Sequence, residues 1–291
     1  MRKPIQSLIS LLDDKDLEVN KAVTAELMKH GLKIIPQLEK VWESTLDGDL
    51  QQRIESLIHF IQVSHTHQQI KEWLDTGATN LLEGAVTLAQ IQYPNISLES
   101  ISSEVERIAS DVNFDSGTSL TAYEKINLLN YVIFDLNHFT RNSANFYSPS
   151  NSFINYVLET RKGNPVSLGI LYLSIARKLK LPVYGVNLPK AFVLAYINEY
   201  RHVEARDKSN DILFYINPYN NGAILTRFDV ERFIVAEKLE PKAEYFLPCN
   251  NEIIMERLIV NLIIAYEKIG YNEKVKPLQQ LLKTINKQIV R

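Results

Sequence analysis

The chain has 291 residues, of which 45% are hydrophobic and 23% are charged, and its formal net charge is −2. This composition is typical of a folded soluble protein, and the near-neutral charge gives no overall field that would attract nucleic acid or an anionic membrane. The one cysteine, Cys249, excludes an intramolecular disulfide framework and a thiolate-rich metal site. No apolar run reaches the length of a signal-peptide core or a membrane span, so we expect a cytoplasmic protein.

The first 95 residues carry the apolar periodicity of amphipathic helices. Apolar stripes run over Leu8–Leu12 and Val19–Leu27, and Gly31 follows where a helix end needs a left-handed residue. Further stripes predict helices over 34–41 and 50–61, one that begins near His67, and one over 80–93. Paired helices at this spacing resemble HEAT repeats, which usually provide binding or supporting surfaces. We therefore interpret residues 1–95 as a HEAT-like helical region.

The middle of the chain is predicted to form helices first and strands afterwards. Helical patterns cover 101–108, 121–134 and 153–163, and another helix begins after the Gly-Asn-Pro turn at 163–165. From Leu181 the pattern becomes that of short, β-branched and aromatic strands, which are expected at 183–188, 191–197, 200–205 and 212–218. From about Asn250 the pattern returns to a helix–turn–helix that resembles a tetratricopeptide-like (TPR-like) pair.

An ordered set of motifs runs from Leu128 to about Arg227. Tyr-x-Pro-x-Asn-Ser at 147–152 is followed by Val-Leu-Glu at 157–159, Arg-x-Gly-x-Pro at 161–165, Leu-Pro at 181–182, Gly-Val at 185–186 and INPYNNGAIL at 216–225. This stretch resembles the SirB-type branch of bacterial transglutaminase-like proteins. The resemblance implies a mostly helical α+β fold. It places a transglutaminase/papain-like core with a small antiparallel sheet at 96–245, between the HEAT-like region and a TPR-like hairpin at 246–291.

The resemblance also shows where catalytic residues would lie. In active transglutaminase-like folds a cysteine starts the central helix, a strand histidine deprotonates it, and an aspartate on the next strand orients the histidine. These roles fall on Ser167 (or Val166 in a register shifted by one), Ala191 and Asn217. A serine hydroxyl is a poor nucleophile without a nearby base, and alanine cannot accept a proton. We therefore expect a degenerate site, in which the loss at Ala191 matters most.

Three other side chains could supply a base. Strand alternation would point Lys190 to the face opposite Ala191, so a solvated lysine is expected. A hairpin around 198–199 would place His202 well along the strand from that position, and His138 is expected in a helix end or loop. Each of these residues is better explained as structural.

Metal, cofactor and thiol chemistry have little support in the sequence. His65 and His67 would face apart on a helix, so no metal site is expected. Glycine-rich phosphate or dinucleotide loops are absent from the sequence, and no cofactor is expected. Cys249 has no neighbour that would lower its pKa, and it is interpreted as a partly buried residue of a connecting segment.

Two functions of different kinds fit these observations. The first is a non-catalytic, regulatory or scaffold protein that binds a protein or peptide, but neither nucleic acid nor a membrane. Its groove at the start of the central helix would be lined by Asn164, Ser167, Tyr172, Lys190, Asn217 and Tyr219. The alternative is a hydrolase or acyltransferase that acts on amide or ester bonds with Ser167 as nucleophile. Without a base we expect the first.

Overall fold

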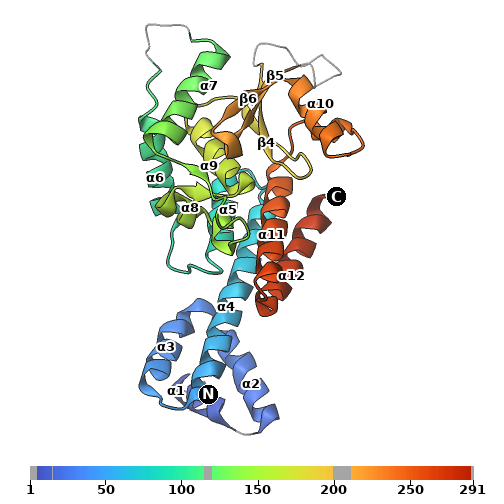
Figure 1. The fold of residues 1–291 in the computed structure, drawn as a ribbon. Coiled ribbons are helices and arrows are strands. Elements are labelled where there is room, and N and C mark those ends of the chain that lie inside the picture. The colour runs from blue at the N-terminus through green and yellow to red at the C-terminus, as the bar shows by residue number, and fades with distance from the viewer. Residues whose placement is uncertain (1–4, 15, 115–119, 199–210, 290–291) are drawn as a thin grey trace. The chain divides into compact units, whose positions relative to one another are not determined.

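The structure is a computed structural model that describes residues 5–14, 16–114, 120–198 and 211–289. The chain divides into two compact units, residues 1–72 with 90–94 and residues 73–89 with 95–291 (Figure 1). This grouping does not coincide with the boundaries at 95 and 245, because helix α5 (Leu81–Ala89) and helix α11 (Asn251–Lys268) both contact α9 (Pro165–Lys178) in the second unit. The division into three domains stays a prediction.

The first unit is built from α1 (Ile5–Ser10), α2 (Leu17–Met28), α3 (Ile35–Ser44) and most of α4 (Gly48–Asp75). Its core consists of Leu8, Ile9, Leu12, Val23, Leu27, Ile34, Leu38, Ile54, Leu57 and Ile61. Gly31 has φ of +56°, which confirms the left-handed residue predicted after α2.

Helix α4 corrects one prediction. We expected separate helices at 50–61 and from His67, but a single helix spans Gly48–Asp75. The segment between the two predicted helices contains no glycine or proline, and Val63 and Thr66 are both buried there. The helix therefore continues through the polar residues that follow position 61.

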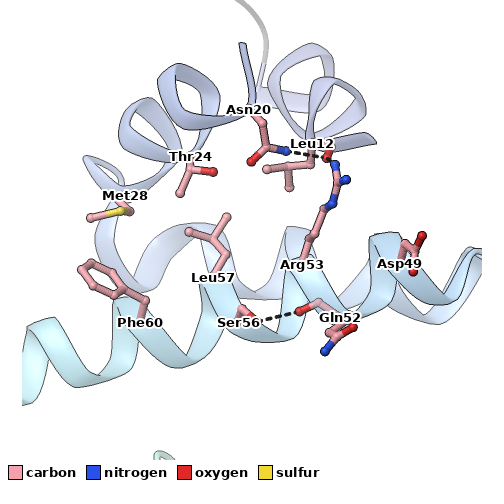
Figure 2. Close-up of a pocket in the computed structure, with 10 residues that line it drawn as sticks. All are labelled: Leu12, Asn20, Thr24, Met28, Asp49, Gln52, Arg53, Ser56, Leu57 and Phe60. Atoms are coloured by element: carbon pink, nitrogen blue, oxygen red, sulfur yellow. Dashed lines mark hydrogen bonds between the residues drawn. The ribbon is translucent and has the colours of Figure 1, made fainter. Parts of the chain in front are cut away.

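A cavity of about 620 Å³ lies between α2 and α4 in the first unit (Figure 2). Leu57, Met28 and Phe60 supply its apolar lining. At one end, the Arg53 guanidinium donates to the carbonyl of Leu12 at 2.8 Å and to that of Asp14 at 3.2 Å. Arg53 thus connects the turn after α1 to α4, and its guanidinium group forms its hydrogen bonds within the unit.

The second unit contains a four-stranded antiparallel sheet in the order β3–β4–β5–β6. The strands are β3 (Val183–Val186), β4 (Val193–Ile197), β5 (Ile212–Asn217) and β6 (Ala223–Leu225), so the strands predicted at 183–188, 191–197 and 212–218 are confirmed. The strand predicted at 200–205 lies outside the described residues.

Helices cover both faces of this sheet. On one face the Phe192 ring lies against α9 so closely that a β-carbon on Gly169 would overlap it. On the other face, α10 (Arg227–Ala236) packs onto an apolar cluster of Val186, Leu188, Val193, Ala195, Tyr215, Val230, Ile234 and Phe246. The sheet is therefore the middle layer between α9 and α10.

The remaining helices complete the second unit. They are α6 (Leu98–Ser110), α7 (Ala122–Asn130), which continues as a π-helical turn (Tyr131–Leu136), α8 (Ile154–Thr160), α11 and α12 (Asn272–Ile289). Helices α11 and α12 form the helix–turn–helix predicted around Gly270. The fold is the mostly helical α+β arrangement expected from the sequence. Within the described residues, no helix is both long and apolar enough to cross a membrane.

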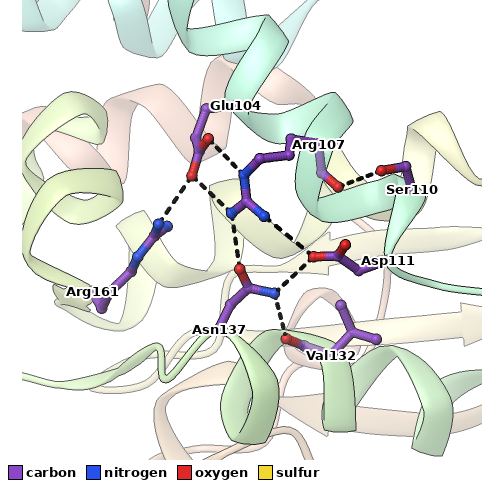
Figure 3. Close-up of polar contacts among 7 residues, drawn as sticks. All are labelled: Glu104, Arg107, Ser110, Asp111, Val132, Asn137 and Arg161. Carbon is purple, nitrogen blue, oxygen red and sulfur yellow. Dashed lines mark hydrogen bonds and ion pairs between the residues drawn. The ribbon is translucent and has the colours of Figure 1, made fainter.

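A polar network joins α6 to the ends of α8 and the π-helical turn (Figure 3). The Glu104 carboxylate accepts hydrogen bonds from Arg107 at 2.9 and 3.0 Å and from Arg161 at 3.0 Å. Arg107 also donates to Asn137 at 2.9 Å, and Asn137 donates to the carbonyl of Val132 at 2.9 Å. The hydrogen bonds from Arg107, aided by Arg161, lower the pKa of Glu104 to about 2.

We expect Glu104→Gln to destabilise the protein by about 1–2 kcal/mol at pH 7, a value discounted because the side chain is 30% exposed. Since the folded pKa lies below the ordinary 4.5, the stabilisation is complete above pH 4.5 and is lost as pH falls towards 2. Urea unfolding of wild type and variant should therefore converge over that range. Glu240→Gln, at an exposed loop position, is the control. A difference that stayed constant with pH would contradict the ionic role.

Candidate functional site

Ser167 lies in the first turn of α9, and its hydroxyl is engaged by neighbours on two sides. The hydroxyl donates to the carbonyl of Asn151 at 2.6 Å and accepts from the backbone N–H of Asn164 at 3.0 Å. The side chain is only 1% exposed. Asn164 caps the helix, because its Oδ1 accepts from the N–H groups of Val166 and Ser167 at 3.0 and 2.9 Å. Ser167 thus serves as one half of a reciprocal helix cap.

The loop before α8 is held against this helix start by asparagine side chains. Asn151 donates from Nδ2 to the carbonyls of Asn145 at 2.7 Å and Phe146 at 3.1 Å, and its Oδ1 accepts from Asn142 at 2.8 Å. Asn164 adds a bond from its Nδ2 to the hydroxyl of Ser152 at 2.9 Å. Our candidate residues did not include Asn142, Asn145 or Asn151. The asparagine-rich run NSANFYSPSN could have indicated them, because buried side-chain amides need hydrogen-bond partners and several amides close in sequence can supply them to one another.

Ala191 is not part of a strand, because β4 begins at Val193. Its methyl group packs with the apolar cluster on the α10 face of the sheet, whereas the next residue, Phe192, packs on Gly169 of α9. The position expected to hold the catalytic histidine therefore carries a methyl group in apolar surroundings.

Lys190 occupies a turn with φ of +62°, so the strand alternation that we applied to it is wrong. Its ammonium group pairs with the Glu237 carboxylate at 2.9 Å, just after α10. The salt bridge gives this lysine a structural partner in place of a groove-facing role. His138 lies in a loop, as predicted, and His202 is outside the described residues.

Asn217 acts as a turn-forming residue. Its Oδ1 accepts from the backbone N–H of Tyr219 at 3.0 Å and so caps the short 3₁₀ helix η6 (Pro218–Asn220). This turn, which contains Tyr219, contacts α9.

Tyr172 is a core residue, so its assignment to the groove wall was wrong. The side chain is 0% exposed, and its hydroxyl donates to Oδ1 of Asn130 at 2.9 Å. Asn130 in turn donates from Nδ2 to the carbonyl of Gly222 at 2.8 Å. Burial raises the pKa of Tyr172 well above its ordinary value, so the phenol stays protonated. The chain of bonds from Tyr172 to Gly222 anchors the segment that carries Tyr219.

Exposed aromatic side chains gather beside the asparagine loop. Phe146 and Tyr147 are 46% and 49% exposed, and their ring centroids lie 5.1 Å apart in an edge arrangement. The half-buried Tyr219 ring lies 6.3 Å from Phe146. We call these three residues the aromatic surface. Lys268 places Nζ 5.6 Å from the centre of the Tyr147 ring. Burial raises the pKa of Tyr219, and the positive charge of Arg141 offsets part of this increase.

Thiol and metal chemistry can be checked for the residues that the structure describes. Burial raises the pKa of Cys249 to about 11, so the thiol is protonated at neutral pH. In the part of the chain that the structure describes, no group of three or more His, Cys, Asp or Glu side chains could hold a metal ion.

We expect Ser167→Ala to destabilise the protein by about 1–3 kcal/mol, because it removes the buried hydroxyl bond to the Asn151 carbonyl and leaves the N–H of Asn164 with only a longer bond of 3.4 Å to that carbonyl. Ser174→Ala on the same helix is the matched control. Its hydroxyl only donates to the carbonyl of Ile170, one turn earlier, so its loss should cost less than about 0.5 kcal/mol. Urea unfolding measures both. Equal losses for the two variants would argue against the capping role.

Comparison with known proteins gives a consistent family. Residues 99–260 match the family model of the transglutaminase-like superfamily. The human F-box only protein 21 is 27% identical over 225 residues, which cover 69% of this chain and 35% of that protein. The UPF0162 protein of Xylella fastidiosa strain 9a5c is 25% identical over 231 residues, which cover 74% of this chain and 75% of that protein.

A shorter match has a higher sequence identity. The UPF0162 protein of Pasteurella multocida is 42% identical over 76 residues, or 26% of this chain and 29% of that protein. The chain spans only about a third of the length of the F-box relatives that it matches. No solved structure is significantly similar to it. Since the family model extends over residues 99–260 of 291, more than half of the sequence, the chain belongs to the transglutaminase-like superfamily.

Proposed function

We propose that this chain is a non-catalytic, SirB-type member of the superfamily that acts in the cytoplasm as a scaffold for a protein or peptide. The proposal rests on the hydrogen bonds of the Ser167 hydroxyl. A serine nucleophile needs a base to remove its proton, but this hydroxyl already donates to the carbonyl of Asn151 at 2.6 Å, and that carbonyl cannot act as a base. Breaking the cap would also cost stability.

The surroundings of the other two positions support the same function. Ala191 packs in an apolar cluster, and the adjacent Lys190 forms a salt bridge with Glu237, so neither offers a proton acceptor. Asn217 uses its side-chain oxygen to cap a turn. The three positions therefore act in packing and capping, and the vacated helix start keeps its shape without acid–base chemistry.

The aromatic surface supports a binding role. Phe146 and Tyr147 expose large apolar rings on a loop that the Asn151 side chain holds in place, so little conformational freedom is lost when a partner binds. Lys268 and Arg141 flank the rings with positive charge. Aromatic rings beside cations suit a peptide that carries apolar side chains next to acidic ones. We propose such a peptide as the partner.

The test begins with peptides selected from a random library on the wild-type chain. We expect the double variant Phe146→Ala/Tyr147→Ala to bind the selected peptides at least about tenfold more weakly, because each buried aromatic anchor contributes about 1–2 kcal/mol. Fluorescence anisotropy measures the Kd. Tyr131→Ala, which removes another exposed aromatic side chain of the second unit, is the control and should bind like the wild type.

Two outcomes would overturn the proposal. Equal affinities of the double variant and the control would remove the aromatic surface from the binding site. Labelling of Ser167 by a serine-reactive probe in the native protein, lost in Ser167→Ala, would instead support the hydrolase alternative.

A further inference from the structure

A second site lies at the other end of α9. A cavity of about 790 Å³ in the second unit is lined by the last turn of α9 and by the residues that follow it, with α5, β3 and the start of α11. Its apolar lining includes Leu81, Leu82, Leu173, Leu181, Val183 and Ile254. Small-molecule sites in proteins have volumes of roughly 300–1,000 Å³, so this cavity is large enough to be one.

Positive charge gathers on this cavity. Arg177, Lys178 and Lys180 line it, and none of the described residues that line it is acidic. Arg177 donates to the carbonyl of Thr79, and Lys178 pairs with Glu106 on α6. Lys180 is exposed, and its side chain makes no hydrogen bond or ion pair with any residue that the structure describes. The cavity therefore carries a cation that is free to meet a ligand.

A purely structural role explains only part of this arrangement. Basic side chains in the last turn of a helix stabilise its negative end, which accounts for Arg177 and Lys178. Lys180 follows the helix in a left-handed conformation, with φ of +54°. Protein interiors are close-packed, so helix stabilisation also does not account for an open space with aliphatic walls beside these cations. A ligand would account for both features.

We infer that this cavity binds a small carboxylate ligand with an aliphatic body. The carboxylate would lie between Lys180 and the guanidinium of Arg177, since a planar carboxylate accepts well from guanidinium N–H groups. The aliphatic body would contact Leu82, Leu181 and Ile254. One free ammonium group and one partly used guanidinium suit a monoanion better than a phosphate, which has more oxygens to satisfy. This site is separate from the aromatic surface and from Ser167.

Decanoate is the probe, titrated calorimetrically into the full chain. We expect decanoate to bind at least about tenfold more tightly than decanol or decylamine, because only the carboxylate gains charge-assisted hydrogen bonds. Lys180→Gln should weaken decanoate binding about fivefold or more. Lys238→Gln is the matched control, since Lys238 is also exposed, also follows a helix, and has the same φ of +54°. It should bind decanoate like the wild type.

The single cysteine provides a second readout. Cys249 lines the cavity, and its raised pKa makes its reaction with N-ethylmaleimide slow, so the reaction is followed over hours at pH 9. Bound decanoate should slow this reaction further, while inorganic phosphate should not. Three results would overturn the inference: decanol binding as tightly as decanoate, equal losses in Lys180→Gln and Lys238→Gln, or decanoate binding without protection of Cys249. Protection by inorganic phosphate at similar concentrations would overturn the choice of a carboxylate with an aliphatic body.

Discussion

Tyr172→Ala is expected to destabilise the second unit by about 3–5 kcal/mol, the range for removing a large aromatic side chain from a core. Tyr172 is completely buried, its ring lies 6.3 Å from that of Phe134, and its hydroxyl bonds to Asn130. Tyr172→Phe keeps the ring and removes only the donor. It should cost about 1–2 kcal/mol, because Oδ1 of the half-buried Asn130 then loses its donor.

The two tryptophans allow this loss to be assigned to one unit. Trp42 belongs to the first unit and Trp73 to the second. In a Trp42→Phe background, urea unfolding followed by tryptophan fluorescence reports on Trp73, whose indole N–H donates to the carbonyl of Asn80 at 2.8 Å. A Tyr172→Ala protein that kept wild-type stability but lost peptide binding would return Tyr172 to a groove wall and contradict its role in the core.

Gly222→Ala is expected to cost about 3 kcal/mol in the same assay, from two separate sources. Gly222 has φ of +72°, so an alanine there adds about 1 kcal/mol of backbone strain. A β-carbon would also overlap Oδ1 of Asn130 and force that side chain from its place. Asn130 would then lose its bonds to Tyr172 and to the Gly222 carbonyl, at roughly 1 kcal/mol each.

Gly270 separates the two sources. It has φ of +80°, but a β-carbon there meets no atom within 4 Å, so Gly270→Ala should cost only the strain, about 1 kcal/mol. In an Asn130→Ala background, Gly222→Ala should likewise fall to about 1 kcal/mol, because the overlapping amide is gone. If Gly222→Ala cost no more than Gly270→Ala, the contact with Asn130 would carry no energy.

These residues connect stability to the proposed binding role. Asn130 holds the Gly222 segment that carries Tyr219, and Asn151 holds the loop that carries Phe146 and Tyr147. Two asparagine side chains, the buried Asn151 and the half-buried Asn130, therefore support the aromatic surface. Variants of either asparagine should lose peptide affinity together with stability, whereas variants of the aromatic residues themselves should lose affinity alone.

Local patterns predicted much of the fold because they depend on neighbours in the sequence. Alternating β-branched and aromatic residues at 183–188 and 191–197 led to β3 and β4, and the Gly270 turn separated α11 from α12. The break predicted within α4 failed because polar residues weaken an apolar stripe without ending a helix. The prediction for Lys190 failed for a related reason. The strand starts two residues later than the predicted 191, and alternation does not hold in the turn that Lys190 occupies.

The sequence by itself determined that position 191 carries no side-chain proton acceptor, because the methyl group of alanine cannot accept a proton in any fold. It also indicated the family, since the motifs from Tyr147 to Leu225 are ordered along the chain. Only the tertiary structure decided that Ser167 caps a helix and that Tyr172 is buried. Helix α9 is apolar on nearly all sides, so its periodicity does not tell which side chains meet solvent. That depends on Asn130, Asn151 and other residues distant in sequence, which folding alone brings to the helix.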